Sequence, residues 1–313
     1  MKNLNNNYHF GDKLFYKIRE KNSFLCLGLD PHLDLIPKVF QTKYKVNNKI
    51  YSKDNIRIVE KFSMMLLETC LNLVPVIKLQ IAFFEQLGPE GMRVFSKICN
   101  IIKKSDSLCI IDAKRGDIGS TSKAYANTFF DKSTPYPCDA LTINPWLGLD
   151  SIEPFVKKIG SKKGLFILVH TSNPGSLDIQ EKSIQGKKKV YEDLADNLKP
   201  LIENYKGQSG LSSIGVVAGA TYKEQIIKLR KNLSSAPFLV PGYGAQGGSI
   251  FNAQEGLVKD INQKNLYNFG VINSSRGLCF PTKAKNCNSF KEWKKFIKEN
   301  LILTNLKLKS NLS

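Results

Sequence analysis

One short stretch of the chain places ionisable side chains at a spacing that suits proton transfer. It runs from Asp112 to Asp117 with the pattern Asp-x-Lys-x-x-Asp, and it directly follows the apolar run Leu108 to Ile111. Asp112 and Lys114 are two residues apart, so at the end of a strand their side chains would lie on the same face. A lysine held beside carboxylates stays protonated and can donate a proton to a carbanion. The stretch therefore predicts acid–base chemistry next to a carboxylate.

A second cation and a turn extend this set. Lys78 lies near the carboxyl end of another apolar run, Val74 to Leu79, and Gly116 and Gly119 allow a sharp turn. After that turn, Asp117 either returns to the same pocket or reaches a neighbouring molecule. A carboxylate close to a substrate carboxylate repels it, and the repulsion is relieved when carbon dioxide leaves. Such a set can promote decarboxylation without a metal or an organic electron sink.

Two segments in the last third of the chain predict an anion site. The segment from Pro241 to Gly248 is rich in glycine, which exposes backbone N–H donors and permits close approach. The segment from Ser274 to Gly277 supplies Arg276, whose planar guanidinium suits a phosphate group. We do not interpret either segment as a dinucleotide-binding turn or as a Walker loop. Their joint placement favours phosphate binding over a flexible loop and a surface charge.

The composition is that of a basic globular protein. The chain has 313 residues, enough for one large domain or two, and its formal net charge is +19. A nucleic-acid-binding protein can carry such a charge. The lysines, however, are spread along surface-type segments rather than gathered in one arm. We therefore interpret most of them as solvated, with some serving an anionic substrate.

The cysteines and the amino terminus predict a cytoplasmic protein. The seven cysteines include no Cys-x-x-Cys pair and lie mostly in apolar segments, which indicates buried free thiols in a reducing compartment. The three histidines do not have metal-ligand spacing, so we expect no metal site. No apolar run approaches the ~20 residues of a membrane span. Residues 1–10 lack the apolar core of a signal peptide.

Eight short β-rich runs alternate with helical stretches along the chain. The runs are Ser23–Leu29, Val74–Leu79, Ser107–Asp112, Cys138–Ile143, Gly164–Val169, Ser213–Val217, Pro237–Val240 and Phe269–Asn273. This alternation predicts an α/β protein with a (β/α)8 TIM barrel, and the count of eight favours it over a doubly wound open sheet. We treat residues 1–313 as a single barrel domain.

Amphipathic patterns predict the helices around this barrel. The predicted helices are Gly11–Lys21, Ile56–Leu71, Gly91–Lys104, Thr121–Phe130, Lys189–Tyr205 and Tyr222–Asn232. Asp150 with Glu153, and Ser289 with Glu292, have the spacing of capping boxes at two further helix starts. Residues 38–54 are polar and basic, which predicts a surface insertion, and residues 308–313 are predicted to be a flexible tail.

Polar residues gather at the expected carboxyl ends of the strands, where the active sites of such barrels lie. They are Asp30, Lys78, Asp112, Lys114, Asn144, Ser172, Gln246 and Arg276. Core residues with incidental polarity would not gather at the same end of seven of the eight strands. The pattern therefore predicts a single active site at that end of the barrel.

Five linked motifs resemble those of the orotidine 5′-phosphate decarboxylase family. They are Leu29-Asp30-Pro31, Asp112 to Gly119 with Lys78, Thr171 to Pro174, Pro241 to Gln246, and Ser275-Arg276-Gly277, in the family's order. The resemblance implies decarboxylation of orotidine 5′-monophosphate to uridine 5′-monophosphate, the last step of de novo pyrimidine nucleotide synthesis. It also implies a homodimer with shared active sites and no cofactor. It is also compatible with an association of this chain with orotate phosphoribosyltransferase.

The resemblance implies a role for each matched residue. Lys114 would protonate carbon 6 of the pyrimidine, Asp112 would lie beside the departing carboxylate, and Lys78 would bridge that aspartate and the ribose. Asp117 would come from the other subunit. The implied substrate-binding residues are Ile118 and Thr121 from the other subunit, Asp30 at the ribose, Thr171 and Ser172 at the pyrimidine, Gln246 and Arg276 at the phosphate, Pro241 in a closing loop, and Asn144 in the pocket wall.

Two rival functions fit part of this pattern. A sugar-phosphate decarboxylase or aldol-type synthase of the same superfamily shares Asp-x-Lys-x-x-Asp but uses a divalent metal. The Thr171-Ser172 pair and the segment from Pro241 to Gln246 argue against it. A basic nucleic-acid-binding barrel would bind with strong salt dependence, but it leaves the paired aspartates unexplained. We therefore expect no binding of nucleic acid.

Overall fold

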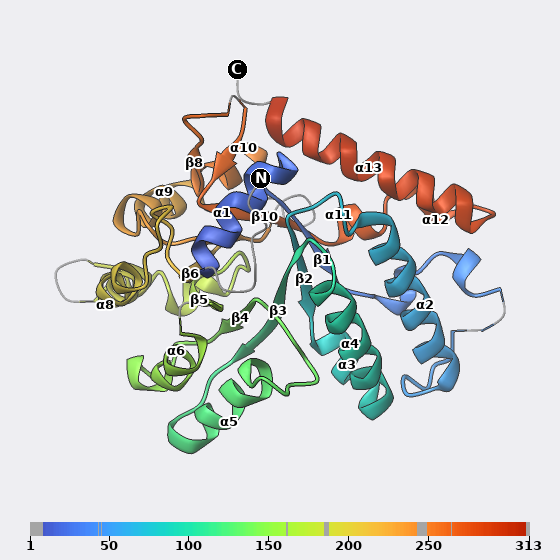
Figure 1. The fold of residues 1–313 in the computed structure, drawn as a ribbon, viewed down its shortest axis with the longest axis horizontal. Coiled ribbons are helices and arrows are strands. Elements are labelled where there is room, and N and C mark those ends of the chain that lie inside the picture. Colours follow the sequence, from blue (N-terminus) through green and yellow to red (C-terminus); the bar gives the residue numbers. More distant parts are fainter. Residues whose placement is uncertain are drawn as a thin grey trace.

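The computed structural model describes residues 9–42, 44, 46–160, 162–184, 188–242, 249–263 and 265–310. Eight parallel strands close into a barrel in the order β1-β10-β7-β6-β5-β4-β3-β2 (Figure 1). The strands are β1 (Leu25–Leu29), β2 (Val76–Gln80), β3 (Leu108–Arg115), β4 (Ala140–Ile143), β5 (Gly164–His170), β6 (Ile214–Ala218), β7 (Phe238–Val240) and β10 (Gly270–Ser274). The predicted (β/α)8 TIM barrel is confirmed. An open sheet is excluded because β1 pairs with both β2 and β10.

Helices surround the barrel, as Figure 1 shows. The longer ones are α1 (Phe10–Lys21), α2 (Lys53–Cys70), α4 (Gly88–Lys103), α5 (Gly119–Phe130), α6 (Glu153–Ile159), α8 (Val190–Asn204), α9 (Lys223–Asn232) and α13 (Phe290–Ser310). The short ones are α3 (Ala82–Glu85), α7 (Ser176–Ile179), α10 (Ile250–Glu255), α11 (Arg276–Cys279) and α12 (Thr282–Lys285). Strands β8 (Val258–Lys259) and β9 (Tyr267–Asn268) form a separate antiparallel pair that the sequence patterns do not predict.

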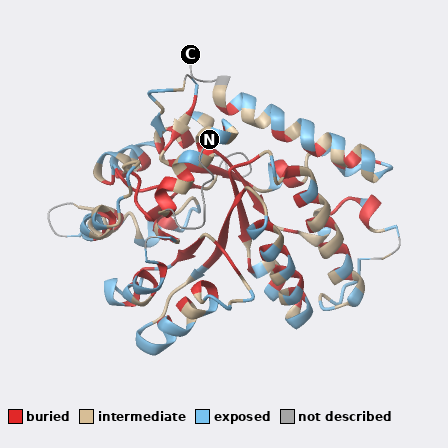
Figure 2. Cartoon of the chain, in the orientation of Figure 1, coloured by how far each residue is buried: buried red, intermediate tan, exposed pale blue. Residues whose placement is uncertain are grey.

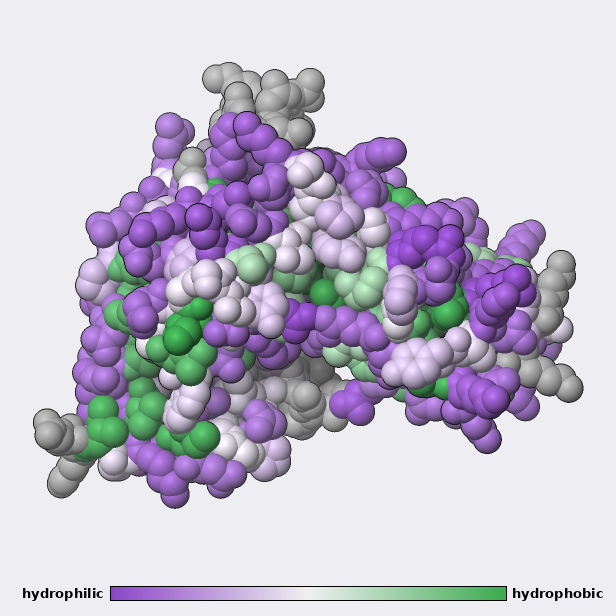
Figure 3. Space-filling view, turned by 90° about the horizontal axis from the view of Figure 1, so that it is seen from below, coloured by the Kyte–Doolittle hydropathy of each residue, from purple (hydrophilic) through white to green (hydrophobic). Residues whose placement is uncertain are grey.

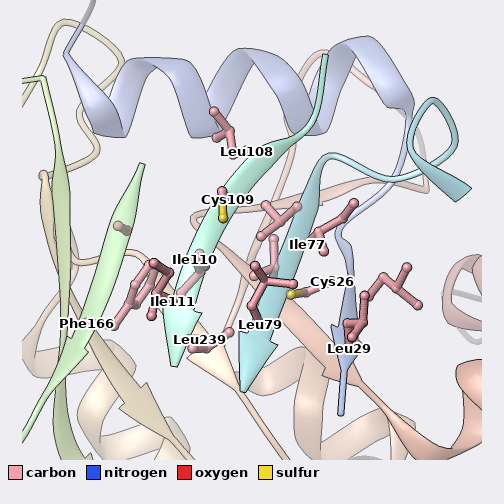
Figure 4. Packing of buried hydrophobic residues seen from close by; sticks show 14 of the residues in the cluster. Cys26, Leu29, Ile77, Leu79, Leu108, Cys109, Ile110, Ile111, Phe166 and Leu239 are labelled. Carbon is pink, nitrogen blue, oxygen red and sulfur yellow. The ribbon is translucent and has the colours of Figure 1, made fainter. Parts of the chain in front are cut away.

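Apolar side chains fill the barrel and the layer between strands and helices. Every residue of β1 and β6 is buried, and Figure 2 shows that burial is concentrated on the strands and on the inner faces of the helices. Figure 4 shows Leu29, Leu79 and Ile111 on the adjacent strands β1, β2 and β3. Burial of apolar surface contributes roughly 25 cal/mol per Å². This core supports the strand ends on which the polar residues lie.

Helix α1 covers the amino end of the barrel, and it agrees with the helix predicted at residues 11–21. Phe10 packs edge-on against Phe166 of β5, with 6.1 Å between ring centroids. Gly164, the first residue of β5, lies so close that an added Cβ would come within 2.3 Å of the Phe10 ring. Asp12 accepts a hydrogen bond from the backbone nitrogen of Ser209 at 2.7 Å. These contacts hold α1 against the end of the barrel opposite the predicted site.

The surface is mainly hydrophilic with separate apolar patches on the face in Figure 3. Several lysines form local ion pairs, as Lys97 does with Glu60. The seven cysteines all lie in the described part of the chain and are buried free thiols, as predicted. Within that same part, none of the helices combines the length and the apolar character that crossing a membrane requires.

The segment at residues 38–54 is only partly the polar surface insertion that we predict. Phe40 ends a 3-10 turn and is 1% exposed, because its ring packs against Phe62 and Trp293. Lys53 and Asp54 already belong to helix α2. The prediction is wrong for Phe40 because the apolar pair Val39-Phe40 is too short to show a periodicity that could reveal its burial.

The predicted capping box at Asp150 does not form. Asp150 lies in a 3-10 turn (Leu149–Ser151), and α6 begins at Glu153 with Ile152 as its N-cap and no side-chain cap bond. The chain enters this turn through Gly148, whose φ of 98° is in the left-handed region. The turn therefore takes the place of a side-chain cap.

Helix α13 differs from its prediction at both ends. Ser289 Oγ accepts from the backbone nitrogen of Glu292 at 3.2 Å, but the Glu292 carboxylate accepts from Asn288 rather than from Ser289. The helix continues to Ser310, and Leu308 is fully buried. The predicted flexible tail is therefore wrong for residues 308–310, and residues 311–313 lie outside the described residues.

Candidate active site

A cavity of about 670 Å³ opens at the carboxyl ends of the barrel strands. The predicted site residues that line it are Asp30, Lys78, Asp112, Lys114, Thr171, Ser172, Pro241 and Arg276. They lie within or shortly after β1, β2, β3, β5, β7 and β10. Segments that are far apart in the sequence therefore share one cavity.

Asp112 is the centre of a charged cluster in this cavity. Its Oδ2 accepts a hydrogen bond from Lys78 Nζ at 2.9 Å, and its Oδ1 accepts one from Lys114 Nζ at 2.6 Å. Lys78 Nζ also lies 3.5 Å from Oδ1 of Asp30. Asp112 and Lys78 are buried, whereas Lys114 is exposed. Charges of opposite sign therefore alternate from Asp30 through Lys78 and Asp112 to Lys114.

Burial and charge pairing act in opposite directions on the two buried groups. Burial raises the pKa of Asp112, but the charges and hydrogen bonds of Lys78 and Lys114 outweigh it and hold that pKa below its ordinary value. Burial lowers the pKa of Lys78, but the carboxylates of Asp112 and Asp30 outweigh it and raise that pKa above its ordinary value. Asp112 is therefore ionised and Lys78 is protonated near neutral pH.

The end of β3 has an irregular register that presents Lys114 to the cavity. Strand β3 pairs with β4 at Ile111 opposite Leu141, and pairing resumes at Arg115 opposite Ile143. More residues lie between these pairs on β3 than on β4, which is the definition of a bulge. Lys114 has a φ of 47°, a left-handed conformation that is uncommon for a residue with a Cβ. The bulge lets its ammonium reach the preceding aspartate.

Gln80 is a site residue that the sequence analysis does not identify. Its Nε2 donates a hydrogen bond to Oδ2 of Asp112 at 3.1 Å, and its side chain lines the cavity. Gln80 follows Lys78 by two residues on β2, so strand alternation places both on one face. That spacing is a signal that could have identified it. Other polar side chains in the lining that we do not predict as site residues are those of His32, Asn173, Asn273 and Ser275.

Asp117, Ile118 and Thr121 are not among the described residues that line the cavity. Oδ1 of Asp117 accepts a hydrogen bond from the backbone nitrogen of Ile118 at 2.8 Å. The Ile118 side chain is 57% exposed. The sequence left Asp117 either in the pocket of its own chain or at a neighbouring molecule. The structure does not place it in the pocket of its own chain.

Asn144 also lies away from the described lining of the cavity. Its Oδ1 accepts from the backbone nitrogen of Trp146 at 3.0 Å, and its own backbone nitrogen donates to the carbonyl of Arg115 at 2.8 Å. An added Cβ on Gly116 would come within 2.6 Å of the Asn144 carbonyl oxygen. Asn144 therefore joins the loop after β4 to the loop after β3, instead of forming the predicted pocket wall.

The loop after β5 forms one wall of the cavity. The backbone nitrogen of Thr171 donates to Gln180 at 2.8 Å, and Thr221 Oγ1 donates to the carbonyl of Ser172 at 3.1 Å. An added Cβ on Gly219 would lie 2.8 Å from the Ser172 nitrogen, so glycine is needed for this close approach. These contacts fix the backbone of Thr171 and Ser172 at the cavity.

Another part of the wall comes from the ends of β7 and β10. Pro241 follows β7, and Arg276 begins helix α11 and is exposed. Asn273 Oδ1 and Ser275 Oγ are buried and have no hydrogen-bond partner among the described residues. The predicted residue Gln246 lies outside the described residues. This wall therefore offers a cation and buried polar atoms to a polar ligand.

The arrangement suits proton transfer next to a carboxylate. In the described part of the chain, no three or more His, Cys, Asp and Glu side chains are grouped so that they could hold a metal ion. The Asp112 carboxylate instead accepts from two ammonium groups, one of which, on Lys114, is exposed at the cavity. This geometry can repel an anionic substituent and then supply a proton.

The chain is similar to orotidine 5′-phosphate decarboxylases in sequence and structure. Residues 23–279 match the model of the orotidine 5′-phosphate decarboxylase / HUMPS family. The chain is 40% identical over 276 residues to the orotidine 5′-phosphate decarboxylase of Clostridium tetani, covering 88% of this chain and 90% of that protein. The structure of the Leishmania donovani OMP decarboxylase has a TM-score of 0.67 and 27% identity, covering 94% of this chain and 99% of that one. The structure of the Leishmania donovani UMP synthase has a TM-score of 0.68 and 28% identity, and the match covers 94% of this chain and 57% of that one.

Proposed function

Because this chain belongs to the orotidine 5′-phosphate decarboxylase / HUMPS family and decarboxylates orotidine 5′-monophosphate to uridine 5′-monophosphate, we propose that Lys78, Asp112 and Lys114 perform this reaction. Asp117 of a second copy completes the set. The observation that carries the proposal is the Asp112 carboxylate held between Lys78 at 2.9 Å and Lys114 at 2.6 Å within the cavity.

The reaction proceeds by charge repulsion followed by protonation. The substrate carboxylate binds beside the ionised Asp112, and the repulsion between the two anions is relieved when the bond from carbon 6 to the carboxylate breaks. The electron pair of that bond stays on carbon 6, and carbon dioxide leaves. Lys114 Nζ then gives a proton to carbon 6, which forms the C–H bond of the product. The pKa of Asp112, held below its ordinary value by the two lysines, supports its ionised role.

The walls of the cavity bind the rest of the nucleotide. Asp30, 3.5 Å from Lys78, accepts from the ribose hydroxyls, and Thr171 and Ser172 contact the pyrimidine. Arg276 binds the phosphate bidentately, together with Gln246. The loop that begins at Pro241 closes over the nucleotide and excludes water. The exposed position of Arg276 in the cavity lining supports its role at the distal anion.

A second copy of the chain completes each site. Asp117, Ile118 and Thr121 are absent from the described lining of their own cavity, which supports their placement in the site of a partner. Ile118 is 57% exposed and Trp146, in the neighbouring loop, is 68% exposed. Exposed apolar side chains that lie together mark interaction surfaces. In the dimer, the partner covers these two side chains and receives Asp117.

The cellular setting follows from the thiols and from one relative. The seven cysteines, buried and free, fit a reducing cytoplasm. The UMP synthase that resembles this chain is longer, since this chain covers 57% of its length. There the decarboxylase-like region is part of a larger protein, which supports association of this chain with orotate phosphoribosyltransferase.

An absorbance assay with purified full-length protein tests the assignment. Loss of orotidine 5′-monophosphate absorbance should proceed equally with and without a chelator. Lys114→Ala should lower kcat by about 10²–10⁴-fold because the proton donor is lost. Lys231→Ala, which removes an exposed lysine on α9, is the matched control and should keep normal activity. Near-normal turnover in Lys114→Ala would contradict the proposed proton donor.

A further inference from the structure

Thr142 lies opposite the irregular part of β3. Pairing between β3 and β4 stops after Ile111 and Leu141 and resumes at Arg115 and Ile143. Thr142 is therefore the one residue of β4 between these two pairs. It is 1% exposed, so its hydroxyl is inside the protein rather than in the cavity lining.

The Thr142 hydroxyl makes two hydrogen bonds to the catalytic stretch. Its Oγ1 lies 2.8 Å from Oδ1 of Asp112 and 3.0 Å from the backbone nitrogen of Lys114. A backbone N–H can only donate, so the hydroxyl oxygen accepts from Lys114. The single hydroxyl proton is then left for Asp112, which as a carboxylate can only accept. One side chain thus holds both residues at once.

This contact completes the set of donors around Asp112. Lys78 and Gln80 donate to Oδ2, and Lys114 and Thr142 donate to Oδ1. A carboxylate has about four acceptor sites, so the four donors fix its rotation. Two of the donors are neutral, which means that they orient the carboxylate without cancelling its charge. The negative charge that repels the substrate is kept, and its direction is set.

The second hydrogen bond stabilises an unfavourable backbone. Lys114 has a φ of 47°, which is in the left-handed region. Because Lys114 has a Cβ, that Cβ lies unfavourably close to the backbone in this conformation. Its backbone nitrogen lies in the unpaired part of β3, where no strand partner accepts from it. The Thr142 oxygen is that acceptor. It thereby keeps the ammonium of Lys114 within 2.6 Å of Asp112.

We infer that Thr142 is a positioning residue for decarboxylation, and that its hydroxyl sets both the orientation of Asp112 and the backbone of Lys114. This inference rests on the proposed roles of those two residues. Thr142 does not line the cavity, so its effect should fall on the chemical step rather than on binding. A threonine that only packs in the core would be replaceable by valine, which has nearly the same shape.

The test compares Thr142→Val with Thr142→Ser in the full-length protein. Thr142→Val removes the hydroxyl and should lower kcat by about 10- to 100-fold, with KM and the affinity for uridine 5′-monophosphate changed less than about threefold. Thr142→Ser keeps the hydroxyl and should retain kcat within about threefold of the wild type. Wild-type kcat in Thr142→Val, or an equal loss in both variants, would overturn the inference.

Two additions keep the result interpretable. If Thr142→Val does not fold, Thr142→Ser and Thr142→Ala replace the comparison, because they differ only by the hydroxyl; equal kcat values in that pair would overturn the inference. Lys114→Ala is measured alongside. Normal turnover in Lys114→Ala would refute the proposed function itself. An inactive Lys114→Ala beside a fully active Thr142→Val would refute only the role of Thr142.

Discussion

The two sides of the cavity differ in how far their polar groups are already paired. On the side of β2, β3 and β4, the Asp112 carboxylate accepts from Lys78, Gln80, Lys114 and Thr142. On the side of β10, Asn273 Oδ1 and Ser275 Oγ are buried without a hydrogen-bond partner among the described residues. On the first side the Asp112 carboxylate already has its hydrogen-bond donors within one chain, and the second side offers groups that a bound nucleotide can satisfy.

This difference separates chemistry from binding. A charge array that is already oriented needs no reorganisation during the reaction, which is the condition under which electrostatic stabilisation is most effective. Groups that gain partners only with substrate contribute to affinity and to specificity instead. Changes on the side of β3 should therefore affect turnover and folding together. Changes on the side of β10 should affect nucleotide binding.

The largest effect is expected for Asp112→Ala. Turnover should be lost, and the free energy of unfolding should fall by about 3–5 kcal/mol because Lys78 keeps its charge but loses its nearest buried partner. Urea unfolding and the absorbance assay measure the two effects. Asp106→Ala is the matched control, since Asp106 pairs with Lys17 and Lys21 at the surface and its loss should cost about 1 kcal/mol or less. If both variants lose the same free energy of unfolding, Asp112 is no more important for stability than a surface ion pair, and the difference between the two sides of the cavity is contradicted.

A smaller effect, confined to binding, is expected for Arg276→Ala. Removing a charged hydrogen bond to the phosphate should weaken the binding of uridine 5′-monophosphate by about 1.5–3 kcal/mol, while unfolding is unchanged. Calorimetric titration should show that uridine, which has no phosphate, loses little affinity. If nucleotide and nucleoside lose affinity equally, Arg276 does not bind the phosphate.

The smallest of these effects is the change of the unfolding free energy with pH, which should be slight near neutral pH. The pKa of Asp112 is lowered on folding, so its contribution is present above its unfolded value of about 4 and is lost as the pH falls through the folded pKa. The pKa of Lys78 is raised, so its contribution is present below about 10.4 and is lost as the pH rises further.

The comparison of wild type with a Lys78→Met/Asp112→Asn double variant measures this dependence. The difference between their unfolding free energies should be constant between about pH 5 and 9, and it should change only toward the acid and alkaline limits. A difference that changes steeply between pH 6 and 8 would show that at least one of the two groups does not titrate as assigned.

The barrel and most of its polar strand ends could be predicted because their signals are local. The apolar runs are continuous, and polar residues such as Lys78 and Asp112 directly follow or end them. The bulge in β3 could not be predicted, since register depends on the partner strand and not on the sequence of β3 alone. The same is true of Thr142, which reads as an ordinary β-branched strand residue until its two partners are known.

Other differences have similar physical causes. Phe40 is buried through aromatic contacts with residues distant in the chain, which no local pattern encodes. Asn144 follows a strand like the true lining residues, but its side chain accepts from the next turn instead of facing the cavity. Gln80 is the exception, since its two-residue spacing from Lys78 was visible in the sequence.

Mixing two inactive variants tests the central claim most directly. Lys114→Ala and Asp117→Ala should each be inactive alone, but after dissociation and reassociation about a quarter of wild-type activity should return, because half of the dimers then contain one intact site. A mixture of Lys114→Ala with Lys78→Ala is the control and should stay inactive, since both changes affect residues that each chain supplies to its own cavity. If the first mixture also stays inactive, Asp117 does not act in the site of a partner, and the shared charge array is contradicted.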